Sequence, residues 1–136
     1  MDKNDTITIG PGKMSDIIVR IAVKPENRKK LYSRTSRIIG SNKDIFREWI
    51  ESFSGFLEYT EPKAGAMAFV KYNAEIPSIE LAERVLKNQN VLIVPGAHLG
   101  LEGFIRLNLG PQQDKLVTDL ELIKTELETV RAEMNP

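Results

Sequence analysis

The amino-acid sequence predicts an α+β fold, a two-layer sandwich in which helices cover a small β-sheet. Three observations lead to this prediction. Segments with apolar residues at helical spacing alternate with short β-branched runs, glycine and proline separate most of these segments, and 136 residues suit one compact domain. The hydrophobic fraction of 41% and the charged fraction of 28% are ordinary for a globular protein.

The residue pattern over positions 1–24 predicts a strand, a turn and a second strand. Short β-branched, apolar runs occupy residues 6–9 and 17–23, and Gly-Pro-Gly at 10–12 separates them. We expect this segment to lie outside the domain that residues 25–136 form.

Helical structure is predicted from Pro25 to the region of Gly55. Proline suits a first helical turn, and good helix formers follow it. Residues 41–44 resemble a capping box, and apolar residues recur at helical spacing over 45–53. The later stretch is therefore either a second helix or the continuation of the first.

Two strands, a helix and a third strand are predicted next. The apolar runs 56–59 and 66–72 predict strands, and Pro77-Ser78 begins a helix with one apolar stripe. The continuous apolar run 91–94, which Pro95 ends, is typical of a strand covered on both faces. We expect this strand at the centre of the sheet.

The strand predicted over residues 104–109 alternates between two kinds of side chain. Ile105, Leu107 and Leu109 share one aliphatic face. Arg106 therefore lies in the middle of a strand and points away from that face.

The last predicted helix has an apolar stripe whose members step by four and three residues: Leu116, Leu120, Ile123, Leu127 and Val130. A coiled coil would show similar spacing, but two heptads fall short of the three or four that this inference requires. We expect the stripe to pack on the sheet.

The composition excludes several classes of protein. Cysteine is absent, which excludes a disulfide scaffold, a thiolate metal site and a cysteine nucleophile, and fits a cytoplasmic location. No apolar stretch approaches the roughly 18 residues that cross a bilayer. The N-terminus also lacks the features of a signal peptide. We therefore expect a cytoplasmic protein without a membrane partner.

The sequence predicts no metal centre. His98 is the single histidine, and the chain has neither H-E-x-x-H nor a paired-histidine motif. A Ser-His-Asp triad would also need His98, yet the G-x-S-x-G motif is absent. Residues 10–15 lack the spacing of a phosphate-binding loop.

Charge is divided unevenly along the chain. Residues 1–50 hold 11 Lys or Arg and 6 Asp or Glu, whereas residues 51–136 hold 8 and 13. The basic stretch from Lys24 to Arg37 is compatible with nucleic-acid binding or with a solvated helix surface. No aromatic stacking platform accompanies it, which favours the solvated surface.

Several motifs together resemble those of one known family. Residues 91–100 contain V-P-G and a loop with a late glycine, and residues 103–110 read G-F-I-R-L-N-L-G. Residues 61–69 are similar to the family pattern P-x-[GA]-[GA]-x-[FY], and residues 42–50 to N-x-x-x-[LF]-x-x-W. Over residues 20–132 the chain resembles the C-terminal small domain of the fold type I, aspartate aminotransferase-like, pyridoxal-phosphate-dependent aminotransferases.

The resemblance implies that Arg106 binds the α-carboxylate of an amino-acid or 2-oxo-acid substrate. The chemistry of arginine agrees with this role. A permanent cation in a buried strand needs an anion, and the planar guanidinium fits a carboxylate with two hydrogen bonds. The alternative is an internal salt bridge from Arg106 to Glu102 or Glu75.

In this family a large domain holds most of the cofactor site. The resemblance implies that residues 1–24 are a remnant of that domain, with Lys13 as the Schiff-base lysine and Arg20 as a phosphate ligand. The match is imperfect, because Lys13 precedes Arg20 by seven residues rather than eight and Ala22 replaces a glycine.

We therefore predict a truncated or separately produced small domain of an aminotransferase of amino-acid metabolism. It would bind no pyridoxal phosphate and would not transaminate by itself. Its expected partners are the missing large domain or further copies of itself, since Trp49, Phe53 and residues 7–9 would expose apolar surface. Two other interpretations stay open: an autonomous interaction or dimerisation module of this fold, and a nucleic-acid-binding module that uses residues 24–37.

Overall fold

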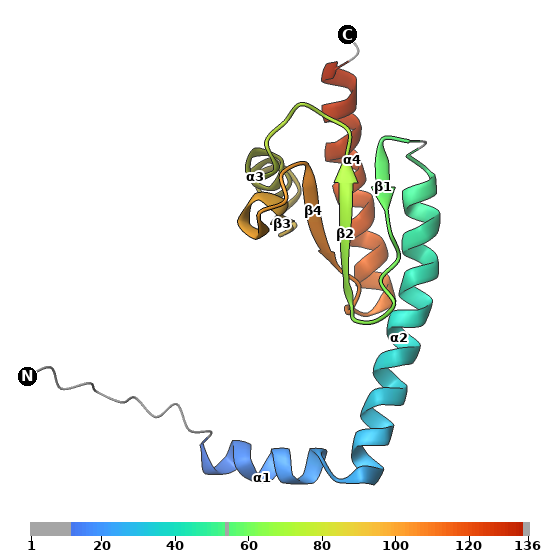
Figure 1. The fold of residues 1–136 in the computed structure, drawn as a ribbon, viewed down its shortest axis with the longest axis vertical. Coiled ribbons are helices and arrows are strands. Elements are labelled where there is room, and N and C mark those ends of the chain that lie inside the picture. Colours follow the sequence, from blue (N-terminus) through green and yellow to red (C-terminus); the bar gives the residue numbers. More distant parts are fainter. Residues whose placement is uncertain (1–11, 54, 135–136) are drawn as a thin grey trace, which may run out of the picture. The chain divides into compact units, whose positions relative to one another are not determined.

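A computed structural model describes residues 12–53 and 55–134 (Figure 1). The chain divides into two compact units, one up to Thr35 and the other from Ser36 onward, and each is described by itself. This division differs from the domain boundary predicted after residue 24. That boundary concerned the domains of a protein family, and it stays a prediction.

The first unit contains helix α1, Lys13–Ala22, and the first turns of helix α2, Pro25–Glu51. The prediction of a strand over residues 17–23 is therefore wrong. The predicted strand at residues 6–9 lies outside the described residues.

Two features of α1 explain why a β-branched run is helical here. Four apolar residues follow the helical spacing i, i+3, i+4, i+7: Met14, Ile17, Ile18 and Ile21. Asp16 and Arg20, on another side of the helix, form an i,i+4 ion pair with an Nε–Oδ2 distance of 2.9 Å. The helical spacing of the apolar residues was thus present in the sequence, but the high content of β-branched residues favoured the prediction of a strand.

Helix α2 continues without a break to Glu51, so the later predicted helical stretch is the continuation of the first. Ser41 does not cap a new helix. Its hydroxyl donates to the carbonyl oxygen of Ile38 at 3.1 Å, a bond within the helix. The resemblance of residues 41–44 to a capping box is therefore misleading.

Four antiparallel strands form the sheet of the second unit in the order β1-β2-β4-β3. Strands β1, Leu57–Tyr59, β2, Met67–Tyr72, and β4, Phe104–Asn108, confirm three predicted strands. Strand β4 pairs with both β2 and β3, so it lies in the interior of the sheet.

Strand β3, Val94–Pro95, lies at the edge of this sheet. The prediction of a central strand covered on both faces over residues 91–94 is therefore wrong. Val91 and Ile93 are buried, but Leu92 between them is 78% exposed. A continuous apolar run can thus be buried on one side only, because its place in the sheet depends on distant strands.

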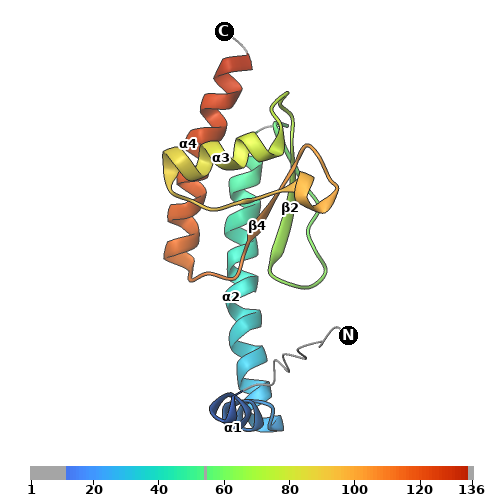
Figure 2. The same cartoon turned by 90° about the vertical axis from the view of Figure 1, so that its left-hand side faces the viewer.

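Helices cover one face of the sheet, which confirms the α+β sandwich. Figures 1 and 2 show α4, Gln113–Met134, on the same side of the sheet as the later part of α2. Helix α3, Ser78–Gln89, packs on α4, and the short 3-10 helix η1, Gly96–Leu99, follows β3. None of the described helices is long and apolar enough to cross a membrane.

One hydrophobic core joins the elements of the second unit. The predicted stripe of α4 is buried in it throughout: Leu116, Leu120, Ile123, Leu127 and Val130. The indole N–H of Trp49 donates to the carbonyl oxygen of Leu120 at 3.0 Å, which joins α2 to α4. Trp49 and Phe53 are both buried, so the prediction that they form an exposed apolar surface is wrong.

Glu126 is a buried carboxylate between α3 and α4, with 3% of its side chain exposed. Arg84 donates to it at 2.8 Å and Asn88 at 2.9 Å, and Arg84 also forms a bidentate pair with Glu133. Burial alone would raise the pKa of Glu126. The hydrogen bonds from Asn88 and Arg84 outweigh burial and lower this pKa below its ordinary value.

The turn after β3 requires a glycine. A Cβ at Gly96 would collide with the carbonyl oxygen of Leu101 and would lie 2.6 Å from that of Phe104. Both oxygens belong to the backbone and cannot rotate away. Gly40 in α2, by contrast, has room for a side chain, since outside its own helix backbone no described atom lies within 4 Å of a Cβ built there.

Replacing Arg84 alone should destabilise the fold far more than replacing Arg84 and Glu126 together. Arg84→Met leaves the buried Glu126 carboxylate uncompensated, which should lower the free energy of unfolding by about 3–5 kcal/mol. Arg84→Met/Glu126→Leu should regain most of this loss. Urea unfolding at neutral pH measures both, and equal losses in the two variants would contradict the prediction.

The same network predicts a pH dependence. The pKa of Glu126 is lower in the folded than in the unfolded chain. Its contribution to the free energy of unfolding is therefore complete above the ordinary carboxyl pKa of about 4.3, and it is lost as the pH falls through the lower folded value. The double variant should lack this part of the acid destabilisation.

Gly96→Ala and Gly40→Ala should shift stability in opposite directions. Overpacking against fixed backbone should make Gly96→Ala cost at least about 2 kcal/mol of unfolding free energy. Gly40→Ala should gain about 0.5–1 kcal/mol, because a mid-helix glycine loses more backbone entropy on folding than alanine. Equal melting temperatures of the two variants would show that the turn after β3 can relax.

Candidate carboxylate-binding site

Strand β4 divides its side chains between the core and the face of the sheet opposite the helices. Ile105 and Leu107 are buried, whereas Arg106 points to the other face and is partly buried. Its cross-strand neighbours are Phe69 on β2 and Val94 on β3. The structure therefore confirms the predicted alternation and places a guanidinium among two apolar neighbours.

The side chain of Arg106 has no hydrogen bond or ion pair with any described residue. Glu102, one of the two carboxylates considered as its internal partner, is engaged elsewhere: it accepts from the backbone N–H groups of Ser78 at 2.6 Å and Gly103 at 3.1 Å. Glu75 is exposed and does not bond to Arg106. The internal salt bridge that the sequence left open is not formed within the described chain.

Glu102 fixes the loop that leads into β4. Its carboxylate lies at the N-terminus of α3, and the hydrogen bonds from the backbone of Ser78 and then Gly103 lower its pKa. The buried Ser78 hydroxyl accepts a hydrogen bond from the N–H of Ala97 at 3.1 Å. Both contacts join the start of α3 to residues 96–103.

Tyr72 completes this polar cluster. Its hydroxyl donates to the carbonyl oxygen of Ile76 at 2.7 Å. Burial first, and then the negative charge of Glu102, raise the pKa of Tyr72 to about 12. Tyr72 is therefore neutral at physiological pH, and as a hydrogen-bond donor it holds the segment that leads into α3.

The sequence did not identify Ser78, Tyr72 and Glu102 as a cluster. Ser78 carried one usable signal, its place at a helix start, and Glu102 was considered only as a partner for Arg106. Twenty-four positions separate Ser78 from Glu102. No local pattern joins residues that far apart, so only the fold brings them together.

Lys13 and Arg20 belong to the first unit, on α1. Both are exposed, and Arg20 is already paired with the carboxylate of Asp16. Seven residues correspond to about 10.5 Å along a helix and nearly two whole turns, so both side chains lie on one side of α1. Their roles as Schiff-base lysine and phosphate ligand stay predictions.

The first unit does contain an apolar groove, but these two residues do not line it. The groove has a volume of about 400 Å³ and lies between α1 and the start of α2, against Ile18, Ile21 and Leu31. Lys13 and Arg20 are both exposed to solvent and lie outside this groove.

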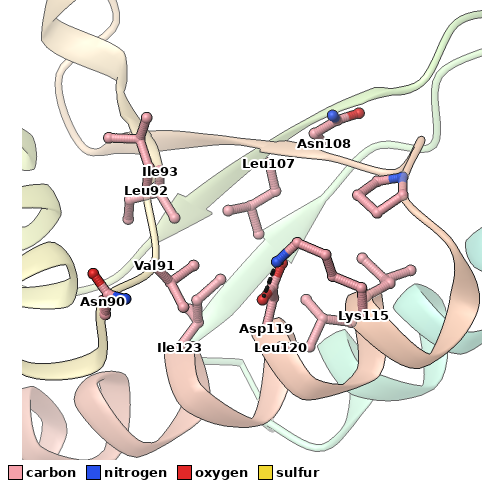
Figure 3. Close-up of a pocket in the computed structure, with 12 residues that line it drawn as sticks. Asn90, Val91, Leu92, Ile93, Leu107, Asn108, Lys115, Asp119, Leu120 and Ile123 are labelled. Carbon is pink, nitrogen blue, oxygen red and sulfur yellow. Dashed lines mark hydrogen bonds and ion pairs between the residues drawn. The ribbon is translucent and has the colours of Figure 1, made fainter.

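A second cavity, of about 290 Å³, lies between α4 and residues 90–93 (Figure 3). Aliphatic side chains such as Val91, Leu107 and Ile123 point into it, and the Lys115–Asp119 ion pair of 2.9 Å lies at its rim. Arg106 does not line this cavity. It is therefore separate from the candidate carboxylate site.

Metal ligands are not gathered anywhere in the described part of the chain. No group of three His, Asp or Glu residues there could hold a metal ion. His98 lies exposed in η1.

Comparisons with known proteins agree with this geometry. No family model matches the chain. A pyridoxal-phosphate-dependent aminotransferase from Streptococcus suis superposes with a TM-score of 0.83 at 25% identity, over 90% of this chain and 32% of that protein. The pyridoxal-phosphate-dependent cyclase OrfR gives a TM-score of 0.80 at 19% identity, over 92% of this chain and 34% of that protein.

One curated protein is also similar in sequence. Capreomycidine synthase from Streptomyces vinaceus is 27% identical over 117 residues, which cover 85% of this chain and 30% of the synthase. The chain thus spans about a third of the length of the proteins it matches. Its fold is that of about a third of a pyridoxal-phosphate-dependent aminotransferase, in agreement with the resemblance to the small domain of the fold type I enzymes.

Proposed function

We propose that this chain is the substrate-carboxylate-binding small domain of an aminotransferase-like enzyme, and that Arg106 binds the α-carboxylate of an amino acid or 2-oxo acid. One observation carries the proposal. Arg106 is partly buried in the middle of β4, yet no described carboxylate pairs with it.

The surroundings of Arg106 support a carboxylate ligand. A guanidinium presents a planar pair of N–H donors that matches the two oxygens of a carboxylate. Phe69 and Val94 flank it in the sheet, and both are apolar and partly buried, which lowers the local polarity. Lower local polarity strengthens a charge-assisted hydrogen bond, so one arginine can orient a small acid here.

The cofactor belongs, in this proposal, to a large domain. The pyridoxal-phosphate-dependent aminotransferase that superposes on this chain is about three times as long, and Lys13 and Arg20 are both exposed outside the groove of the first unit. We therefore infer that the isolated chain does not transaminate. A large domain would supply the phosphate cradle, while Lys13 and Arg20 stay candidates for the Schiff-base lysine and a phosphate ligand.

We propose a cytoplasmic location and a role in amino-acid metabolism, because a chain without cysteine fits the reducing cytoplasm.

The exposed apolar residues of α1 favour a second candidate function, an interaction or dimerisation module, because monomers rarely leave such a patch uncovered.

Arg106→Leu should leave the melting temperature of the chain unchanged or raise it. The substitution removes a partly buried cation that has no described partner, whereas a leucine can pack between Phe69 and Val94. Arg84→Leu is the matched control, because it breaks a buried ion pair and should cost about 3–5 kcal/mol. Thermal unfolding of both variants makes the comparison. A similar large loss in Arg106→Leu would identify a structural ion pair instead.

The same variant tests binding. An NMR titration with 2-oxoglutarate or L-aspartate should perturb the β4 amides of the wild-type chain with millimolar affinity, and Arg106→Leu should abolish the effect. Arg28→Leu, which removes an exposed arginine from the first unit, should leave the titration unchanged. Equal perturbation in wild type and Arg106→Leu would contradict the proposed carboxylate site.

The purified chain should not retain pyridoxal phosphate. After mixing with micromolar cofactor at neutral pH and dialysis, its visible spectrum should show no cofactor band, because an activated lysine needs a desolvated site that residues 12–35 do not enclose. A retained band that disappears in Lys13→Ala would overturn the inference that the chain alone is inactive and would make Lys13 a cofactor ligand.

A further inference from the structure

Helix α1 carries an apolar stripe that its own unit leaves more than half exposed, although Ile18 and Ile21 also line the groove against Leu31. Its members are half-exposed or more: Met14 71%, Ile17 54%, Ile18 59% and Ile21 52%. No residue of α1 is buried. Lys13 and Arg20 flank the stripe on one side, and Asp16 between them forms an ion pair with Arg20, so this side of the helix carries a net positive charge of one. The helix is thus amphipathic, with its apolar side open to a partner.

The net charges of the two units indicate which surface α1 would bind. Residues 12–35 hold seven Lys or Arg against two Asp or Glu, whereas residues 36–134 hold 11 against 15. Two copies of the basic first unit would repel each other face to face. The acidic second unit of another copy attracts it.

The second unit offers a groove of matching character between α2 and α4. It has a volume of about 250 Å³, and Ile45, Trp49, Val117 and Leu120 form its apolar floor and wall. The Trp49–Leu120 hydrogen bond holds the two helices at this place. Glu48, Glu121 and Lys124 also line the groove.

The α2 rim of this groove is acidic. Glu48 lines the groove itself, and Asp44 and Glu51 lie on the same side of α2, where Asp44 also forms an ion pair with Arg47 at 3.1 Å. Asp44 and Glu51 are seven residues apart, as are Lys13 and Arg20 on α1. A helix laid along the groove can therefore place its basic edge against this row while its apolar stripe enters the groove.

We propose that α1 of one copy docks into the α2–α4 groove of a second copy, with Ile17, Ile18 and Ile21 in the groove and Lys13 and Arg20 facing the acidic rim. When two copies dock reciprocally, each with its helix in the groove of the other, the contact is a two-fold dimer. This inference does not depend on the proposed carboxylate or cofactor chemistry.

Cysteine pairing tests the contact directly, since the natural chain has no cysteine. Ile18→Cys and Val117→Cys proteins, mixed and mildly oxidised, should form a disulfide-linked heterodimer about tenfold faster than Ile18→Cys mixed with Leu92→Cys. Leu92 is the control because it is 78% exposed and lies outside the groove. Faster pairing of Ile18→Cys with itself would identify a contact between first units and overturn the proposal.

Sedimentation provides the second measurement. Wild-type chain should be a dimer at micromolar concentration, and its dissociation constant should rise with added salt. Ile17→Asp and Glu48→Lys, both at exposed positions, should each raise the dissociation constant at least about tenfold, while Leu92→Asp should not. Circular dichroism checks that the variants remain folded.

Two results would overturn the proposal. One is a wild-type chain that stays monomeric at hundreds of micromolar. The other is a monomer that binds vesicles of phosphatidylcholine and phosphatidylglycerol and loses this binding in Ile17→Asp, which would assign the apolar stripe to an anionic lipid surface.

Discussion

The second unit depends on one buried amide. The Nδ2 group of Asn42 donates to the carbonyl oxygens of Leu109 and Pro111, each at 2.8 Å, and the side chain is fully buried. Both carbonyls lie just after β4, so these bonds attach the end of that strand to α2. A buried acceptor left without its donor costs about 1–3 kcal/mol, which makes this attachment hard to replace by apolar packing.

The attachment matters because it fixes the register of β4. Leu109 is fully buried next to its bonded carbonyl, and the alternation of the strand then sets Ile105 and Leu107 in the core. A slip of one residue would turn Arg106 into the core and an aliphatic residue outward. The proposed carboxylate site is thus a consequence of the same register that builds the core, with the loop held by Glu102 beside it.

The parts of the structure that the sequence predicted are those that local periodicity determines. The buried stripe of α4, the α3 helix and the two faces of β4 follow from residue spacing alone. The edge position of β3 did not follow from spacing, because it depends on pairing between β2 and β4 across 33 or more positions. The same limit applies to the site: the periodicity of β4 identified the face of Arg106, but not the cluster of Ser78, Tyr72 and Glu102.

The wrong prediction for α1 and the docking role proposed for it have one physical origin. Ile17, Ile18, Val19 and Ile21 are poor helix formers in isolation, and a helix of ten residues is marginal in water even with good ones. Local propensity therefore favoured a strand. The helical spacing of the apolar residues becomes decisive only when the stripe they form is covered, since burial then repays the cost of ordering the backbone. Helix formation in α1 and occupation of its apolar side are consequently linked, and whatever covers the stripe also stabilises the helix that presents it.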